Sequence, residues 1–269
     1  MGVELSTLAF AFGLTLFAGL ATGIGGLIAV MKRNPGPQFI AGALGLSAGV
    51  MLYVSMMELL PAGVESLGEE MGERPANWLA VGAFFAGILL IAVIDRLVPE
   101  DVNPHGTEGA SGKGGRGPEP AMMKTGVMTA VAIGIHNFPE GFATFISGLE
   151  DLTIALPVAL AIAIHNIPEG IAVAVPIREA TEDRRKAVRW ATLSGLAEPA
   201  GALVGFLLFL PLMGPLTLGL VFPLVAGIMV FISLDELLPA AIATGKNHAA
   251  IYGLVLGMAI MALSLLLFI

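Results

Sequence analysis

The sequence of 269 residues has no cysteine and little charge. The absence of cysteine excludes disulfides, thiolate metal sites and cysteine nucleophiles. Only 13% of the residues are charged and 56% are hydrophobic, whereas a typical soluble domain has about 25% charged residues. These proportions exclude an ordinary soluble domain and predict a chain that crosses the lipid bilayer several times. The net charge of −8 argues against a nucleic-acid partner.

The N-terminal stretch MGVELSTLAF lacks the basic residues that precede the apolar core of a cleavable signal peptide, so we expect it to stay in the membrane. Apolar runs of roughly 20 residues are long enough to span a bilayer as helices. The sequence predicts eight such helices, near residues 5–31, 38–60, 76–97, 124–147, 153–177, 188–211, 217–240 and 248–268.

We predict one integral membrane domain, with helices one to three in residues 1–97 and helices four to eight in residues 124–269. Residues 98–123 between them are rich in glycine, proline and charge, which predicts a flexible loop. If the N-terminus lies outside, every Lys and Arg except Arg74 falls on the cytoplasmic side. This asymmetry makes the loop cytoplasmic, and the even number of helices makes both termini extracytoplasmic.

Two segments of the sequence occur twice. IHNFPEGFA at 135–143 recurs as IHNIPEGIA at 164–172, and GVMLYVSMMELLPA at 49–62 recurs as GIMVFISLDELLPA at 227–240. In the predicted topology the two copies of each segment lie on antiparallel helices. Inverted repeats that carry polar residues near the middle of the membrane are typical of transporters.

The first repeat carries possible metal ligands at helical spacing. His136, Asn137 and Glu140 project toward nearly the same face of a helix. The second copy supplies the same groups from His165, Asn166 and Glu169. An imidazole nitrogen, an amide oxygen and a carboxylate suit borderline divalent ions such as Zn²⁺, Fe²⁺, Mn²⁺ and Co²⁺.

Ionised groups at the bilayer centre cost about 2.5–3.5 kcal/mol each, so they rarely face lipid. Glu140, Glu169, Glu198 and Glu236 must therefore face the interior of the bundle. No basic residue lies in the central part of any predicted helix to pair with them. A divalent cation, a proton or a water-filled cavity can neutralise them, and all three belong to a cation pathway. Helix packing around the prolines is the structural alternative, and the duplication of the motif argues against it.

At these motifs the sequence resembles the ZIP (ZRT/IRT-like) family of divalent metal transporters, particularly its bacterial ZupT-like branch. The resemblance rests on HNFPEG, HNIPEG, SGLAE and the two ELLP motifs, and it extends over essentially the whole chain. It implies an all-α membrane protein of eight transmembrane helices in a 3+2+3 inverted-repeat bundle with both termini extracytoplasmic. It also implies transport of metal into the cytoplasm. The short termini and small loop favour a bacterial inner membrane, and a homodimer is compatible with the sequence.

The resemblance further implies a binuclear site in which Glu140 and Glu169 bridge two metal ions. One position would be formed by His136, Glu140, His165 and Glu169, with Met51 nearby as a contributor. The other would be formed by Asn137, Glu140, Asn166, Glu169 and Glu198. Two features depart from the family pattern: Pro199 follows Glu198, and the loop has the single histidine His105.

The leading hypothesis is an importer of Zn²⁺, and also of Fe²⁺, Mn²⁺, Co²⁺ and Cd²⁺, that has no organic cofactor and is not an enzyme. The sequence contains no phosphate-binding loop, so transport would follow an ion gradient. An intramembrane metalloenzyme is the first alternative, but the order His-Asn-x-Pro-Glu leaves no separate catalytic base. A metal channel or an exporter that uses the same ligands stays open.

Overall fold

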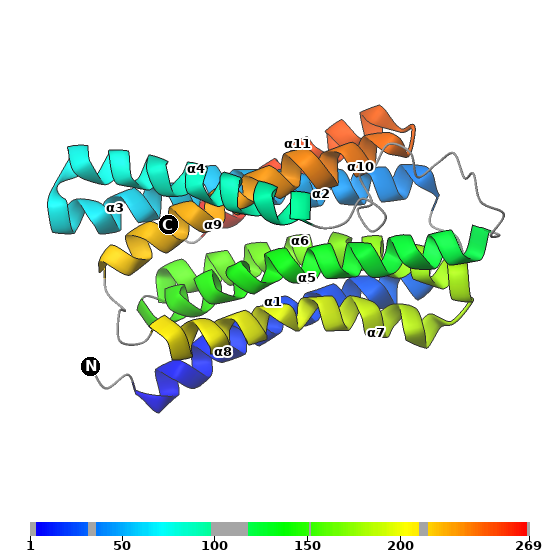
Figure 1. The fold of residues 1–269 in the computed structure, drawn as a ribbon, viewed down its shortest axis with the longest axis horizontal. Coiled ribbons are helices and arrows are strands. Elements are labelled where there is room, and N and C mark those ends of the chain that lie inside the picture. The colour runs from blue at the N-terminus through cyan, green and yellow to red at the C-terminus, as the bar shows by residue number, and fades with distance from the viewer. Residues whose placement is uncertain (1–3, 32–35, 98–117, 151, 210–214, 268–269) are drawn as a thin grey trace.

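The computed structural model describes residues 4–31, 36–97, 118–150, 152–209 and 215–267, all of which belong to helices or to short connections between them. The helices lie side by side along the long axis of the molecule (Figure 1). In chain order they are α1 (Leu5–Met31), α2 (Pro37–Val54), η1 (Ser55–Leu59), α3 (Leu60–Met71), α4 (Glu73–Leu97), α5 (Pro118–Glu150), α6 (Leu152–Thr181), α7 (Arg184–Gly195), α8 (Ala197–Phe209), α9 (Pro215–Ile232), η3 (Ser233–Leu237), α10 (Leu238–Ala243) and α11 (Asn247–Leu267).

Within the described residues, seven helical stretches are long and apolar enough to cross a membrane. They are Leu5–Met31, Pro37–Met71, Glu73–Ile94, Ala155–Thr181, Arg184–Leu208, Gly219–Ala243 and Asn247–Leu266. Each corresponds to a helix expected from the sequence. The remaining expected helix is α5, which has 33 residues but carries the polar HNFPE stretch in its apolar sequence. The all-α membrane fold is confirmed, and the count of eight spanning helices stays a prediction.

Several boundaries differ from those expected. The second stretch continues past residue 60 to Met71, because the helix passes into the amphipathic α3, whose Leu67 packs on Ala76 and Ala80 of α4. Helix α5 begins at Pro118, inside the expected loop 98–123, of which residues 98–117 lie outside the described part.

The helix expected near 188–211 begins earlier, at Arg184, because Asp183 caps the start of α7. The carboxylate of Asp183 accepts hydrogen bonds from the backbone N–H groups of Arg185 at 2.8 Å and Lys186 at 3.1 Å. These bonds satisfy donors that the first turn of a helix leaves without a partner.

The two copies of the second repeat share an unusual local structure. Each contains one π-helical segment, η1 in the first copy and η3 in the second. The first residue of each segment is a serine, Ser55 or Ser233. Its hydroxyl donates a 2.7 Å hydrogen bond to the main-chain carbonyl of a methionine one turn earlier. Pro61 and Pro239 follow, and because proline has no N–H, the wider π turn accommodates it without breaking the helix. The repeat in the sequence is therefore also a repeat in backbone conformation.

Helix packing repeats in the same way. Helix α2 packs along α11, and α9 packs along α4. A methyl group added to Gly49 of α2 would overlap the carbonyl oxygen of Leu254 on α11, and one added to Gly227 of α9 would overlap that of Phe84 on α4. Small residues thus let the backbones of both helix pairs come close, as in other membrane bundles.

This close packing generates a prediction for α4. Gly87→Val would force side-chain atoms into the carbonyl oxygen of Leu224 on α9, and overpacking of this kind costs about 1–3 kcal/mol. We expect a lower melting temperature for the purified protein in detergent. Gly82→Val on the same helix is the matched control, because an added Cβ there meets nothing within 4 Å. Equal melting temperatures for the two variants would contradict the packing described here.

Candidate metal site

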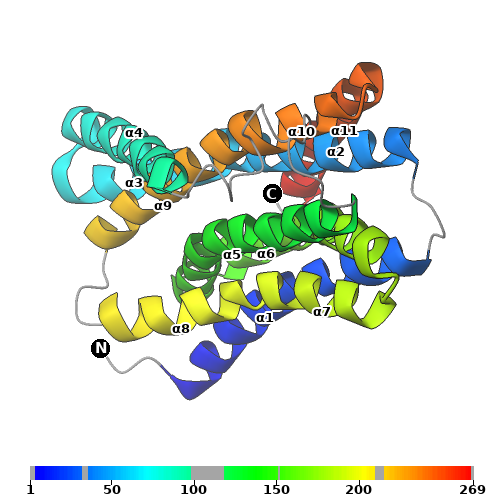
Figure 2. The ribbon, with the colours of Figure 1, turned by 45° about the vertical axis from the view of Figure 1, so that its right-hand side comes forward.

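The two HNxPEG motifs lie on neighbouring helices at the centre of the bundle. Helices α5 and α6 follow each other in the chain and pack side by side, with α1 against α6 and α8 against α5 (Figure 2). Both helices continue through the motif prolines, Pro139 and Pro168. The described polar side chains of both motifs are buried, as is Glu198 in the first turn of α8. The buried polar residues are Asn137, Glu140, His165, Asn166, Glu169 and Glu198.

Two contacts join residues of different helices within this set. The Nε2 atom of His165 on α6 lies 3.5 Å from Oε1 of Glu140 on α5, so the two motifs meet directly. The side-chain amide of Asn166 donates to the carboxylate of Glu198 on α8. The same amide donates to the main-chain carbonyl of Ala18 on α1 at 2.9 Å. Asn166 thereby connects three helices at the site.

Helix α2 approaches the site from the other side. Ser47 Oγ donates to Oε1 of Glu169 at 3.3 Å and lies 3.4 Å from the carbonyl oxygen of His165. Met51 lies one turn further along α2, fully buried in an apolar cluster that includes Phe142 of α5.

The asparagine of the first motif also bonds to the main chain of a neighbouring helix, as Asn166 of the second motif does. The side-chain amide of Asn137 donates to the main-chain carbonyl of Ser194 on α7 at 3.4 Å. The side chain of His136, a predicted ligand on α5, lies outside the described part of the structure.

The electrostatics of this set favour a cation. Glu140, Glu169 and Glu198 are each at most 1% exposed, and none of the described Lys and Arg side chains is buried with them. Both carboxylate oxygens of Glu140, Oε2 of Glu198 and Oδ1 of Asn137 and Asn166 accept no hydrogen bond among the described residues. A buried polar atom without a partner costs about 1–3 kcal/mol. Carboxylate and amide oxygens beside an imidazole are a suitable donor set for a divalent metal ion.

The observed arrangement consists of pairs of side chains. Nowhere in the described part of the chain do three His, Asp or Glu side chains gather closely enough to hold one ion. The amide oxygens of Asn137 and Asn166 are further oxygen donors in the same interior.

Residues 98–265 match the protein family described as ZIP Zinc transporter. The chain belongs to this family. It is 66% identical to a zinc transporter ZupT of Corynebacterium efficiens over 99% of this chain and all of that protein. It is 56% identical to a zinc transporter ZupT of Streptococcus mutans over 96% of this chain and 97% of that protein. A zinc transporter ZupT of Clostridium perfringens is 51% identical over 100% of this chain and 99% of that protein.

Membership of the ZIP family confirms several predictions from the sequence. The chain is an integral membrane protein of the bacterial inner membrane, and it is a transporter rather than an enzyme. The match to a family of zinc transporters supports zinc, a divalent metal ion, as the transported substrate. This family membership removes the intramembrane metalloenzyme from the alternatives.

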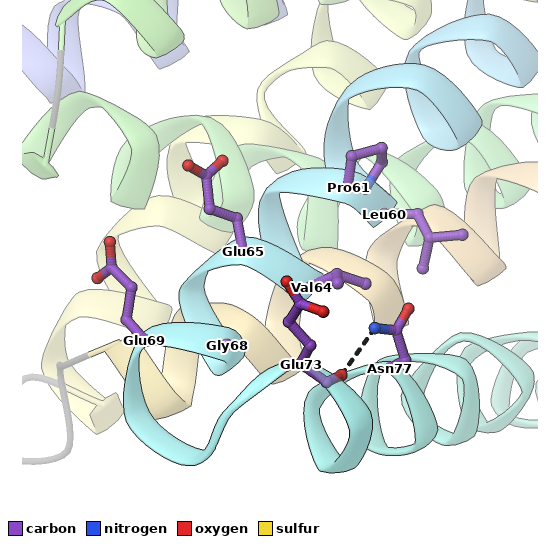
Figure 3. A pocket seen from close by; sticks show the side chains of 8 residues that line it. All are labelled: Leu60, Pro61, Val64, Glu65, Gly68, Glu69, Glu73 and Asn77. Carbon is purple, nitrogen blue, oxygen red and sulfur yellow. Dashed lines mark hydrogen bonds between the residues drawn. The ribbon is translucent and has the colours of Figure 1, made fainter.

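The ZIP chain also has an open acidic cavity away from the buried site. This cavity of about 760 Å³ lies at α3 and the start of α4, where Glu65, Glu69 and Glu73 line it (Figure 3). Asn77 also lines it and donates to the carbonyl oxygen of Glu73 at 2.7 Å. None of the predicted metal ligands lines this cavity, so the carboxylates around it provide exposed controls for those of the buried site.

Sequence reasoning missed three contributors to the site. Ser47 is the only serine in the apolar helix α2, and its position one turn before Met51 was the only signal available. The carbonyl groups of Ala18 and Ser194 carry no signal, because every residue has one. Helix packing alone determines which carbonyls the two asparagine amides reach.

The contacts of Asn166 predict a stability effect. In Asn166→Ala the Ala18 carbonyl and the Glu198 carboxylate lose a buried donor, and such a loss costs about 1–3 kcal/mol. We expect a clear drop in melting temperature without metal. Asn77→Ala is the control, because its amide also donates to a carbonyl but is exposed, so its melting temperature should stay near that of the wild type. Equal losses in both variants would mean that Asn166 does not support the site.

Proposed function

We propose that the chain imports divalent metal ions, Zn²⁺ foremost, into the cytoplasm through an intramembrane binuclear site on α5, α6 and α8. The observation that carries the proposal is the burial of Glu140, Glu169 and Glu198 among described residues that include no buried Lys or Arg. The relatives are named zinc transporters. A divalent cation that enters from outside would neutralise these carboxylates.

The first metal position would use nitrogen and oxygen donors from both motifs, namely His136, Glu140, His165 and Glu169. Its support is the 3.5 Å approach of His165 to Glu140 across the two helices. Met51, one turn from Ser47, would lie beside this position, because Ser47 contacts Glu169.

The second metal position would use oxygen donors alone, namely Asn137, Glu140, Asn166, Glu169 and Glu198, with both motif glutamates bridging the two ions. Its support is the contact of Asn166 with Glu198 and the amide oxygens that lack a partner. When an ion binds, Oδ1 of Asn166 can turn to the metal while its Nδ2 keeps the bond to Ala18.

The transport cycle would use the 3+2+3 inverted repeat with both termini extracytoplasmic. The matched π segments, η1 and η3, and the matched pairs of α2 with α11 and α9 with α4 support this symmetry. Inverted repeats of this kind give alternating access when the helices that hold the site move against the others. The metal would leave on the cytoplasmic side, driven by its own or a coupled ion gradient.

The donor set selects weakly among metals, because nitrogen and oxygen sites follow the general affinity order of divalent ions. We therefore propose Fe²⁺, Mn²⁺, Co²⁺ and Cd²⁺ as competing substrates and no organic cofactor. An exporter and a channel are the alternatives for the same site. Vesicle flux of known orientation separates an importer from an exporter, and saturation with counterflow separates a carrier from a channel. Oligomeric state stays open to measurement, and we predict no nucleic-acid partner.

The proposal predicts the loss of transport when either bridging carboxylate is removed. In proteoliposomes, wild-type uptake of radiolabelled Zn²⁺ should saturate, and Glu140→Ala and Glu169→Ala should each lower it at least tenfold. Glu65→Ala and Glu69→Ala remove carboxylates that line only the acidic cavity, so uptake should stay within about twofold of wild type. Folding of every variant is checked by size-exclusion chromatography.

Three outcomes of this experiment would count against the proposal. Full uptake by both motif variants would mean that the two motifs serve helix packing and not metal transport. Absence of wild-type flux with Zn²⁺, Fe²⁺ and Mn²⁺ would contradict transport itself. Flux only from the cytoplasmic to the extracytoplasmic side would identify an exporter.

Uptake should also depend on pH. The carboxylates bind metal only when deprotonated, so protons compete with the ion. Lowering the pH on the face from which metal enters should raise the half-saturating Zn²⁺ concentration, while the maximal rate at saturating Zn²⁺ should change less. Unchanged half-saturation from neutral to mildly acidic pH would contradict a carboxylate-rich site.

A further inference from the structure

The surroundings of the two motifs match contact by contact. On α6, the Asn166 amide donates to the carbonyl of Ala18 on α1. On α5, the Asn137 amide donates to the carbonyl of Ser194 on α7. Asn137 and Asn166 occupy the same position in their motifs. Ala18 therefore corresponds structurally to Ser194, and α1 corresponds to the helix formed by α7 and α8.

A second pair of contacts lies one helical turn after the first pair on both sides. A methyl group added to Gly170 of the α6 motif would overlap the carbonyl oxygen of Thr22. A methyl group added to Gly141 of the α5 motif would overlap the carbonyl oxygen of Glu198. Thr22 follows Ala18 by one turn, just as Glu198 follows Ser194 by one turn. Thr22 is therefore the structural counterpart of Glu198.

A third contact marks the axis that relates the two sides. A methyl group added to Gly19 would overlap the carbonyl oxygen of Gly195, and one added to Gly195 would overlap that of Gly19. These two glycines follow Ala18 and Ser194 directly, so they too are counterparts of each other. The correspondence thus covers a full turn of helix on each side.

The hydroxyl of Thr22 differs from the hydroxyls of three other threonines in the described helices. Thr15, Thr144 and Thr192 each donate to the carbonyl one turn earlier, at 2.9–3.0 Å. Thr22 is fully buried, and its Oγ1 has no hydrogen-bond partner among the described residues. The carbonyl one turn earlier is that of Ala18, which already accepts the Asn166 amide. The hydroxyl oxygen is left available to another group.

The hydroxyl also lies beside the oxygen-rich part of the site. A methyl group added to Gly195 would lie 2.8 Å from Thr22 Oγ1, and Gly195 lies three residues before Glu198. Asn166 bridges the carbonyl one turn before Thr22 and the carboxylate of Glu198. The Asn166 amide donates to Glu198, so the correspondence predicts that Thr22 lies on the side of Asn137. Oδ1 of Asn137 also has no partner among the described residues.

We propose that the hydroxyl oxygen of Thr22 is a neutral ligand of the metal ion at the second position, opposite the carboxylate of Glu198. The inference rests on the proposed function and extends its ligand set to α1. If position 22 also carried a carboxylate, the site would have a fourth negative charge beside those of Glu140, Glu169 and Glu198. The neutral oxygen of Thr22 lowers the affinity of the second position for the ion, which favours release during transport.

The first test is calorimetric titration of the purified full-length protein with Zn²⁺. Thr22→Val removes the hydroxyl at almost constant volume, and we expect it to weaken the second binding event about tenfold and to leave the first unchanged. Thr22→Ser should restore wild-type binding. Ser264→Ala is the matched control, because Ser264 on α11 is the other described hydroxyl that is buried without a partner, and binding should not change.

The second test uses the absence of cysteine in the chain. Thr22→Cys introduces the only thiol, and thiolate is a strong ligand for soft divalent ions. Titration with Cd²⁺ should produce an ultraviolet thiolate-to-metal charge-transfer band that saturates at one ion per protein. Ser264→Cys should produce no such band. This readout needs no transport and holds even where Thr22→Val folds poorly.

The outcomes separate this inference from the proposed function. Unchanged second-site affinity in Thr22→Val, or no Cd²⁺ band in Thr22→Cys while wild type still transports Zn²⁺, would overturn the role of Thr22 alone. Absence of Zn²⁺ binding and flux in the wild type would overturn the proposed function. A weakened second event that Thr22→Ser restores would establish Thr22 as a ligand.

Discussion

Three carboxylates lie buried in the middle of a helical membrane bundle, and no described Lys or Arg is buried with them. Ionised groups at this depth are costly unless an opposite charge neutralises them. The imidazole of His165 lies 3.5 Å from Glu140, but it offsets the negative charge only when it is protonated. The organisation of the other helices around these groups follows from this constraint. The bundle must exclude lipid from the carboxylates and still let a cation reach them.

Close helix packing provides the exclusion of lipid. Glycines in both motifs allow α1 to lie directly against α6 and α8 to lie directly against α5, and the asparagine amides reach main-chain carbonyls of α1 and α7. These bonds hold the amide nitrogens and leave the amide oxygens of Asn137 and Asn166 without partners among the described residues. The same packing that stabilises the bundle therefore orients oxygen donors toward the interior. Stability and the proposed cation binding depend on the same contacts here.

The symmetry of the bundle is close in its backbone and incomplete in its side chains. The contacts of α1 with α6 match those of α8 with α5, yet Thr22 stands where the related helix has Glu198. A symmetric backbone can support two related conformations of similar energy, which alternating access requires. A difference in charge between these related positions would let the two proposed metal positions differ in affinity. Backbone symmetry and side-chain asymmetry thus serve different needs of a transporter.

The sequence by itself determined the membrane class, seven helices among the described residues that are long and apolar enough to cross a membrane, and the two repeated segments. Hydropathy and helical spacing are local properties, so the sequence alone carries them. It also identified Glu140, Glu169 and Glu198 as interior groups, since no lipid-facing position tolerates them. Only the tertiary structure decided which helices lie against the motifs, and hence that Asn166 reaches Ala18, that Ser47 reaches Glu169 and that Thr22 corresponds to Glu198. Such contacts join residues far apart in the chain, and they depend on helix rotation and close approach, which hydropathy does not encode.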